Sequence, residues 1–183
     1  EQRYFAAKLA AVLPQQQRQQ RVLDVVRQID RDVRTYVGIK TLVSVITSLA
    51  AWVVMVLAGL DFAAFWALLI FVLNFIPNIG SLIATLLPSL LALVQFDSLG
   101  PFLVVLLGVG AIQILVGNVL EPNLMGKSLN VSPLAIILSL VAWGYLWGIA
   151  GMFLCVPITV IAMIVLYNFE NTRWLALLVS QDG

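Results

Sequence analysis

Long apolar stretches separated by short polar connectors fill the chain from residue 38 onward. Two of them, residues 38–60 and 99–120, are each long enough to cross a hydrocarbon core of ~30 Å as one α-helix. Small polar residues such as Thr41 and Ser44 lie within the first stretch, where they suit close contacts between helices. The pattern therefore predicts two full membrane-spanning helices.

The apolar stretch at residues 62–96 is broken in its middle. Its parts, 62–75 and 81–95, are each short for a full crossing. Between them Pro77 lacks a backbone donor and clashes with the preceding turn, and Gly80 permits a positive φ. The helix is therefore expected to end or kink here. The result is either a re-entrant hairpin with its tip inside the membrane or two short, tilted spans.

A second broken stretch, at residues 133–145 and 152–169, resembles the first. The membrane part thus divides into two halves, 38–96 and 99–169, each with one long helix followed by a broken pair. An odd number of crossings in each half would invert one half relative to the other, and matching broken helices indicate a transporter site. The residues expected to act as hinges or gates of these pairs are Pro88, Gly144, Gly148, Gly151 and Pro157.

Residues 1–37 are polar and amphipathic. Apolar side chains recur there with the spacing of one helix face, at Val22, Val25, Val26, Ile29, Val33 and Val37. This pattern predicts a cytoplasmic helical segment that is either an ordinary connector or an interfacial helix on anionic lipid headgroups. The expected organisation is this segment, a transmembrane domain at 38–171 and a tail at 172–183.

The composition agrees with this pattern. Hydrophobic residues make up 62% of the chain and charged residues 10%, whereas soluble domains have roughly 45–50% and 25%. Because the backbone must satisfy its own polar groups in lipid, and the apolar stretches are too long for barrel strands, we predict an all-α integral membrane protein. Its architecture would be a polytopic helical bundle with broken or re-entrant helix pairs and an amphipathic N-terminal helix.

The basic residues are concentrated at the N-terminal end. Eight of the ten Lys and Arg residues lie within the first forty positions: Arg3, Lys8, Arg18, Arg21, Arg27, Arg31, Arg34 and Lys40. Since basic segments stay on the cytoplasmic side of a membrane, the N-terminus is expected in the cytoplasm. Both topologies return the C-terminus to that side. We therefore expect a multi-pass protein of the bacterial inner membrane.

Residue sets suited to catalysis or metal binding are not apparent. The chain has no histidine and one cysteine, Cys155, which lies inside an apolar run. A phosphate-binding loop and a serine with a partner base are also missing. We expect no enzyme activity, cofactor, metal or nucleic acid. Without imidazole, any proton-coupled step must use carboxylates.

A few polar residues lie at membrane depth. The predicted solute pathway consists of these residues together with the break: Asn74, Pro77, Asn78, Gly80, Gln113, Asn118 and Glu121. The amides could instead bond between helices or cap them, and Glu121 could lie at the interface or pair with Lys127. An acid inside a bilayer is nevertheless usually functional. We predict that the Pro77 break, with backbone groups freed by Pro77 and Gly80, and the Glu121 region form one functional unit.

Three ordered motifs carry a family resemblance. They are FVLNFIPNIG at 71–80 followed by Pro88, NVLEPNLMG at 118–126 followed by LNVSP at 129–133, and WGYLWGIAGM at 143–152 followed by Pro157. Together they resemble the signatures of the autoinducer-2 exporter (AI-2E) transporter family, over almost the whole chain as that family's C-terminal part. The resemblance implies further helices upstream and efflux of a small hydrophilic quorum-sensing signal, or sodium/proton exchange in some members.

The leading hypothesis is a secondary transporter that exports a small hydrophilic, autoinducer-2-like solute. A sodium (monovalent cation)/proton antiporter is an alternative, for which Glu121 is the one obvious intramembrane acid. A non-transporting structural membrane protein is another, although it would not need paired broken helices. The expected partners are the lipid bilayer, a small polar solute, a proton or sodium ion, and further copies of the chain. This homo-oligomer is expected because Gly108, Gly110 and Gly117 favour close helix approach.

Overall fold

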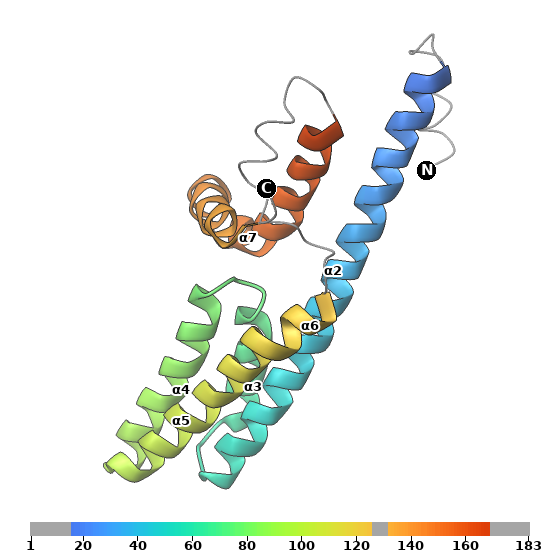
Figure 1. Cartoon of the computed structure of the whole chain (residues 1–183). Coiled ribbons are helices and arrows are strands. Elements are labelled where there is room, and N and C mark those ends of the chain that lie inside the picture. Colours follow the sequence, from blue (N-terminus) through green and yellow to red (C-terminus); the bar gives the residue numbers. More distant parts are fainter. Residues whose placement is uncertain (1–15, 126–131, 169–183) are drawn as a thin grey trace.

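The computed structural model describes residues 16–125 and 132–168, and this part of the chain is helical without strands. Four of its helices are long and apolar enough to cross a membrane. The elements are α2 (Gln16–Leu57), α3 (Ala63–Leu73), α4 (Ile79–Phe96), α5 (Leu99–Leu115), the π-helix η1 (Val116–Leu120), α6 (Glu121–Met125) and α7 (Pro133–Asn168) (Figure 1). The predicted all-α polytopic membrane fold is confirmed.

Helix α2 joins the amphipathic segment to the first span. It runs without a break from Gln16 to Leu57, so the described part of the N-terminal segment is continuous with the first span. Its contact with lipid headgroups stays a prediction. The residue expected at the junction, Gly38, has open space around it and lies within the helix. The chain turns at Gly59, whose φ is +74°, and then enters α3.

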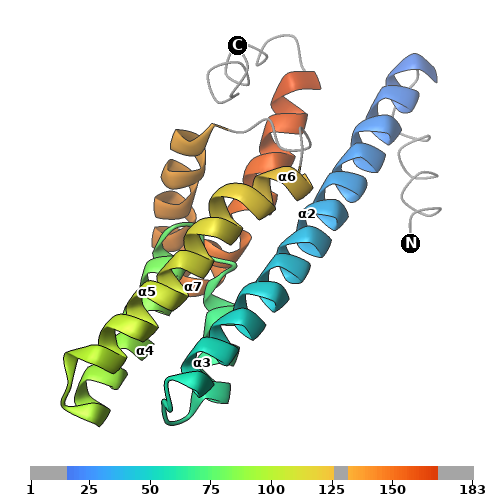
Figure 2. The same cartoon turned by 60° about the horizontal axis from the view of Figure 1, so that its bottom comes forward.

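Helices α3 and α4 form the first predicted broken pair and lie against each other (Figure 2). The break is where the sequence placed it, between Leu73 and Ile79. Gly80 is required there, because a Cβ on it would lie 1.8 Å from the carbonyl oxygen of Leu73. The prediction that both helices are short holds only for α3. Its 11 residues rise about 16 Å, whereas α4 has 18 residues and meets the length of a span.

Helices α5, η1 and α6 form one continuous rod from Leu99 to Met125. The Ser98 hydroxyl oxygen caps its start by accepting a hydrogen bond from the backbone N–H of Gly100 at 3.4 Å. The helix predicted for residues 99–120 therefore continues as far as Met125. This rod runs antiparallel to α2, and the two pack side by side (Figure 1).

Helix α7 is the second broken pair, and its two parts meet at Gly148, where φ is +62° and ψ is −142°. This kink confirms the interruption predicted for residues 143–151. Gly151 has the same role here as Gly80 has in the first pair, since a Cβ on Gly151 would lie 1.9 Å from the carbonyl oxygen of Trp143. Pro157 lies inside the second part without ending it.

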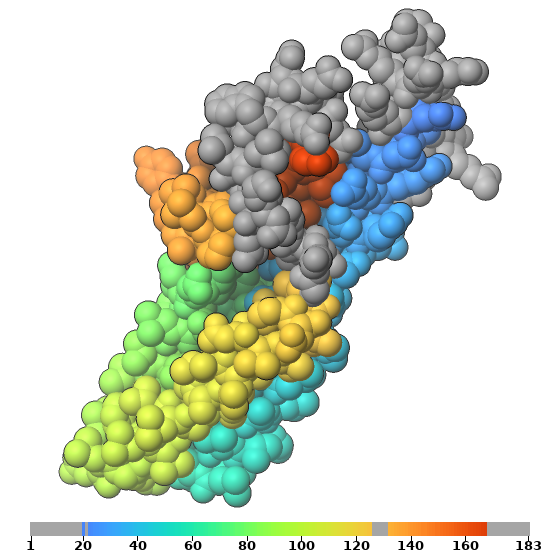
Figure 3. All heavy atoms as spheres, in the orientation of Figure 1, coloured from blue at the N-terminus to red at the C-terminus, as the bar shows by residue number. Residues whose placement is uncertain are grey.

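The apolar interior consists of two clusters. One joins α2, α3, α4 and α5 around Met55, Ile70 and Val105. The other joins α7 to α2 and to the α3–α4 break, through Tyr36 and Ile76. In the space-filling view α7 lies over the end of the α3–α5 body where this break is found (Figure 3). The break therefore lies where the two clusters meet.

Gly108 packs inside this body. A Cβ on it would lie 2.7 Å from a methyl carbon of Val54, so this glycine serves the contact between α5 and α2 within one chain. It therefore gives no support to the predicted homo-oligomer, which stays a prediction. The inverted repeat of residues 38–96 and 99–169 stays a prediction as well. Residues 1–15 and the tail at 172–183 lie outside the described residues.

Candidate functional site

A cavity of about 630 Å³ opens between α2, the α3–α4 break and the α5–η1–α6 rod. Its polar lining consists of Lys40, Thr47, Asn74, Asn78, Ser81, Thr85, Gln113, Asn118 and Glu121. Six of the seven residues predicted for the pathway line the cavity: Asn74, Pro77, Asn78, Gln113, Asn118 and Glu121. The seventh, Gly80, is buried beside it and allows the close approach of α4 to α3. The Pro77 break and the Glu121 region thus line the same cavity, and their role as one functional unit stays a prediction.

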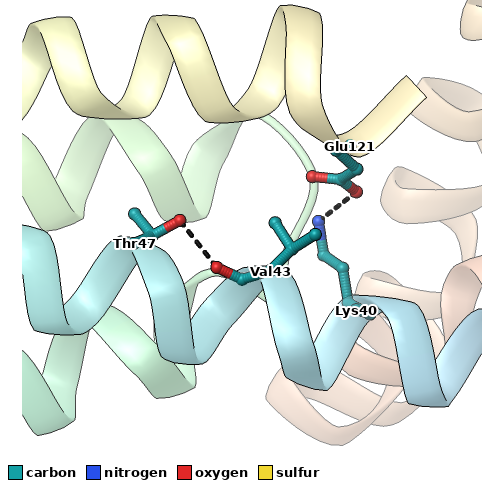
Figure 4. A network of polar contacts seen from close by, with 4 residues as sticks. All are labelled: Lys40, Val43, Thr47 and Glu121. Atoms are coloured by element: carbon teal, nitrogen blue, oxygen red, sulfur yellow. Dashed lines mark hydrogen bonds and ion pairs between the residues drawn. The ribbon is translucent and has the colours of Figure 1, made fainter. Parts of the chain in front are cut away.

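An ion pair lies at one end of this cavity. Lys40 Nζ, from α2, donates a hydrogen bond to Glu121 Oε1, at the start of α6, over 2.5 Å (Figure 4). The lysine side chain is 8% exposed and the glutamate 22%. Removing one partner of a buried pair costs about 3–5 kcal/mol, because the other charge stays unpaired. The pair therefore fixes α2 against the end of the rod.

Sequence reasoning missed Lys40 as part of the site. We grouped it with the basic N-terminal residues, although it lies inside the apolar stretch at 38–60. A lone cation at that position was the available signal, since an intramembrane charge usually has a partner. The alternative partner of Glu121, Lys127, lies outside the described residues.

Four carboxamides add to the charged pair: Asn74, Asn78, Gln113 and Asn118 line the cavity. The Gln113 amide nitrogen is buried and has no hydrogen-bond partner within the described structure. Asn78 lies at the break itself with a φ of +58°. Each carboxamide has both donor and acceptor atoms, so the cavity can bond to either kind of group on a solute.

The hydroxyl groups of the lining are already donors. Thr47 donates to the carbonyl oxygen of Val43 at 2.8 Å, as Figure 4 shows. Ser81 donates to Asn78 and Thr85 to Ser81, both at 2.9 Å. With their protons engaged in this way, these hydroxyls present lone pairs to the cavity and act as acceptors.

Several backbone N–H groups at the break form hydrogen bonds within it. The N–H of Ile76 bonds to Leu73, that of Ile79 to Pro77 and that of Gly80 to Ile76. Turns within the break thus satisfy these three N–H groups. The contribution of a freed backbone carbonyl near Pro77 stays a prediction.

The π-helix η1 was not predicted, and it lines the cavity through Val116, Gly117 and Asn118. Short π segments widen one turn of a helix and often occur at functional sites. Here the wider turn lies directly before Glu121 and leaves both Asn118 and Glu121 on the cavity wall. The pattern of apolar and polar residues, which follows the period of an α-helix, does not indicate where a π-helical turn occurs.

The predicted hinge residues do not line the cavity. Gly144, Gly148, Gly151 and Pro157 belong to α7, and Pro88 is buried inside α4. They shape the two broken pairs, and their role in gating stays a prediction. No group of three His, Cys, Asp or Glu side chains that could hold a metal occurs among residues 16–125 and 132–168.

Curated proteins similar to this chain are transport proteins. It is 42% identical, over 84% of its length and 44% of the relative's, to the AI-2 transport protein TqsA of Escherichia coli K12. It is 39% identical, over 85% of its length and 42% of the relative's, to a candidate transport protein of Borreliella burgdorferi. The chain thus spans less than half the length of these relatives.

The family comparison agrees with the motifs. The model of the AI-2E family transporters matches residues 1–171, which includes the broken pair at Pro77, the rod with Glu121 and the pair at Gly148. Since four helices of its described part are long and apolar enough to cross a membrane, the chain is part of a multi-pass membrane protein. It belongs to the AI-2E transporter family.

Proposed function

We propose that this protein exports a small hydrophilic solute of the autoinducer-2 kind through the cavity between α2, the α3–α4 break and the α5–η1–α6 rod. The observation that carries the proposal is this polar cavity inside an otherwise apolar bundle, with the Lys40–Glu121 pair at its end. Buried charges at membrane depth are retained where they serve a transport pathway. The name of the relative TqsA supports autoinducer-2 as the first solute to test.

The lining suits a solute with many hydroxyl groups. A hydroxyl both donates and accepts, and the carboxamides of Asn74, Asn78 and Gln113 offer both functions. The hydroxyls of Thr47 and Thr85 act as acceptors. Within the described part of the chain, no aromatic side chain that could stack on an aromatic solute lines the cavity. A compact polyhydroxylated molecule therefore fits this chemistry better than an aromatic one.

Exchange of a monovalent cation for a proton is the second candidate, because Glu121 is a carboxylate on the cavity wall. It is less favoured, since Lys40 already holds this carboxylate. We further propose that the protein acts in the bacterial inner membrane as a homo-oligomer, with both termini in the cytoplasm. Its solute would leave the cell in this arrangement.

Efflux from vesicles tests the proposal. The purified protein is reconstituted with autoinducer-2 inside, and its release is timed with and without a proton or sodium gradient. Asn118→Ala should slow release about tenfold, whereas Asn123→Ala, an exposed asparagine of α6 outside the cavity, should not. Release at the rate of protein-free vesicles would refute the solute. Sodium-driven proton movement without solute would favour the antiporter.

A further inference from the structure

The two charged residues of the cavity have opposite signs and cancel. Lys40 and Glu121 are the charged side chains among the residues that line it, and they contact each other at 2.5 Å. The remaining polar lining consists of neutral amides and hydroxyls. A solute in this cavity therefore meets a wall with no net charge but many hydrogen-bonding groups.

Among residues 16–125 and 132–168, no third ionisable group lines the cavity that could balance an added charge. The Tyr36 phenol on α2 interacts electrostatically with Glu121, and the Cys155 thiol on α7 interacts with Lys40. Both are buried in the apolar cluster next to the break. A solute with net charge would have to leave one member of the pair, or itself, without a counter-ion in a low-dielectric site.

We infer that the Lys40–Glu121 pair is a charge filter, which makes the cavity accept uncharged solutes and reject anions and cations of the same size. The inference rests on the proposed function for the solute's route and adds the class of solute that the route takes. Each residue is also a latent ion site: without Glu121 the Lys40 ammonium takes a small anion, and without Lys40 the Glu121 carboxylate takes a small cation.

The first test measures binding without transport. In Glu121→Ala the missing carboxylate leaves room beside Lys40, and acetate should raise the melting temperature of the purified protein. In Lys40→Ala methylammonium should do the same beside Glu121. The wild-type protein in the same salts at equal ionic strength is the control for general salt effects. Asp97→Ala is the matched variant, because Asp97 is an exposed acid in the turn between α4 and α5, and acetate should not stabilise it.

The second test measures selectivity in vesicles with probes of matched size: ribose as the neutral probe and ribonate as the anion. Wild-type protein should prefer ribose, and Glu121→Gln should shift the preference toward ribonate by about tenfold or more. The exchanged pair Lys40→Glu/Glu121→Lys keeps both charges and should fold even if the single variants do not. It should also keep the wild-type preference.

The outcomes separate this inference from the proposed function. Ion-specific stabilisation without any autoinducer-2 efflux would support the filter and refute the proposed solute. Efflux of autoinducer-2 with no stabilisation by either ion would overturn the filter and leave the function standing. The filter also fails if acetate stabilises Asp97→Ala as much as Glu121→Ala, or if the exchanged pair prefers ribonate.

Discussion

The two broken helix pairs have the same backbone features but differ in the polar side chains that they bring to the cavity. Each turns at one residue of positive φ, Asn78 in the first pair and Gly148 in the second. In each a glycine then lets the second helix pass close to a carbonyl of the first. Only the first pair, however, lines the cavity with polar side chains. The geometry of a break and the chemistry of a solute site are thus separate properties.

The polar side chains of the second pair form hydrogen bonds within that pair. The Thr159 hydroxyl donates to the carbonyl oxygen of Cys155 at 2.6 Å, and the Ser139 hydroxyl lies within hydrogen-bonding distance of both the Thr159 hydroxyl and that carbonyl oxygen, the latter at 3.2 Å. These contacts join the two parts of α7. The first pair instead leaves Asn74 and Asn78 facing the cavity. We infer that one pair serves the solute and the other serves the scaffold.

The largest loss of stability is expected when a side chain is added at the glycines where the two helices of each pair come closest. Gly80→Ala and Gly151→Ala each place a carbon within 2 Å of a backbone oxygen, and each should lower the free energy of unfolding by about 3 kcal/mol. Thermal unfolding in detergent measures this. Gly38→Ala is the control, since nothing lies near that glycine. A loss confined to Gly80→Ala would show that the two pairs do not share this device.

A smaller effect is expected from the turn of the second pair. Gly148 combines a φ of +62° with a ψ of −142°, a region that only glycine occupies readily. Gly148→Asn should therefore lower stability by about 1–3 kcal/mol. Because Gly148 lies outside the cavity lining, efflux per folded molecule should be unchanged. Reduced efflux with normal stability would instead assign Gly148 the gating role predicted from the sequence.

The hydrogen bonds of Thr159 inside α7 are expected to contribute less to stability than the turn at Gly148. Thr159→Val keeps the shape of the side chain and removes the hydroxyl that bonds to Cys155 and Ser139. Stability should fall by about 1 kcal/mol, the usual net value of a hydrogen bond. Thr85→Val, which removes an acceptor from the cavity, is the matched change in the first pair. It should slow efflux, and Thr159→Val should not.

The sequence predicted the breaks better than it predicted the site. Pro77, Gly80 and the glycines near Gly148 restrict the backbone locally, so their effect can be read from neighbouring residues. The Lys40–Glu121 contact joins positions 81 residues apart, and no local pattern specifies it. By geometry Gly80 corresponds to Gly151, and Asn78 to Gly148.

The smallest change in stability, with a clear change in function, is expected from Asn78→Gly. Asn78 has a φ of +58° and a ψ of −55°, which glycine adopts at lower energy than asparagine. Stability should therefore stay level or rise by up to about 1 kcal/mol.

The same substitution removes a carboxamide from the cavity wall, so efflux should fall about tenfold if that amide binds the solute. Unfolding and vesicle efflux measured on one preparation separate the two properties. Asn123→Gly, at an exposed position of α6, is the control for glycine itself: it should lower stability by about 1 kcal/mol and leave efflux per folded molecule unchanged. Wild-type efflux in Asn78→Gly would mean that the first pair, like the second, supplies only geometry.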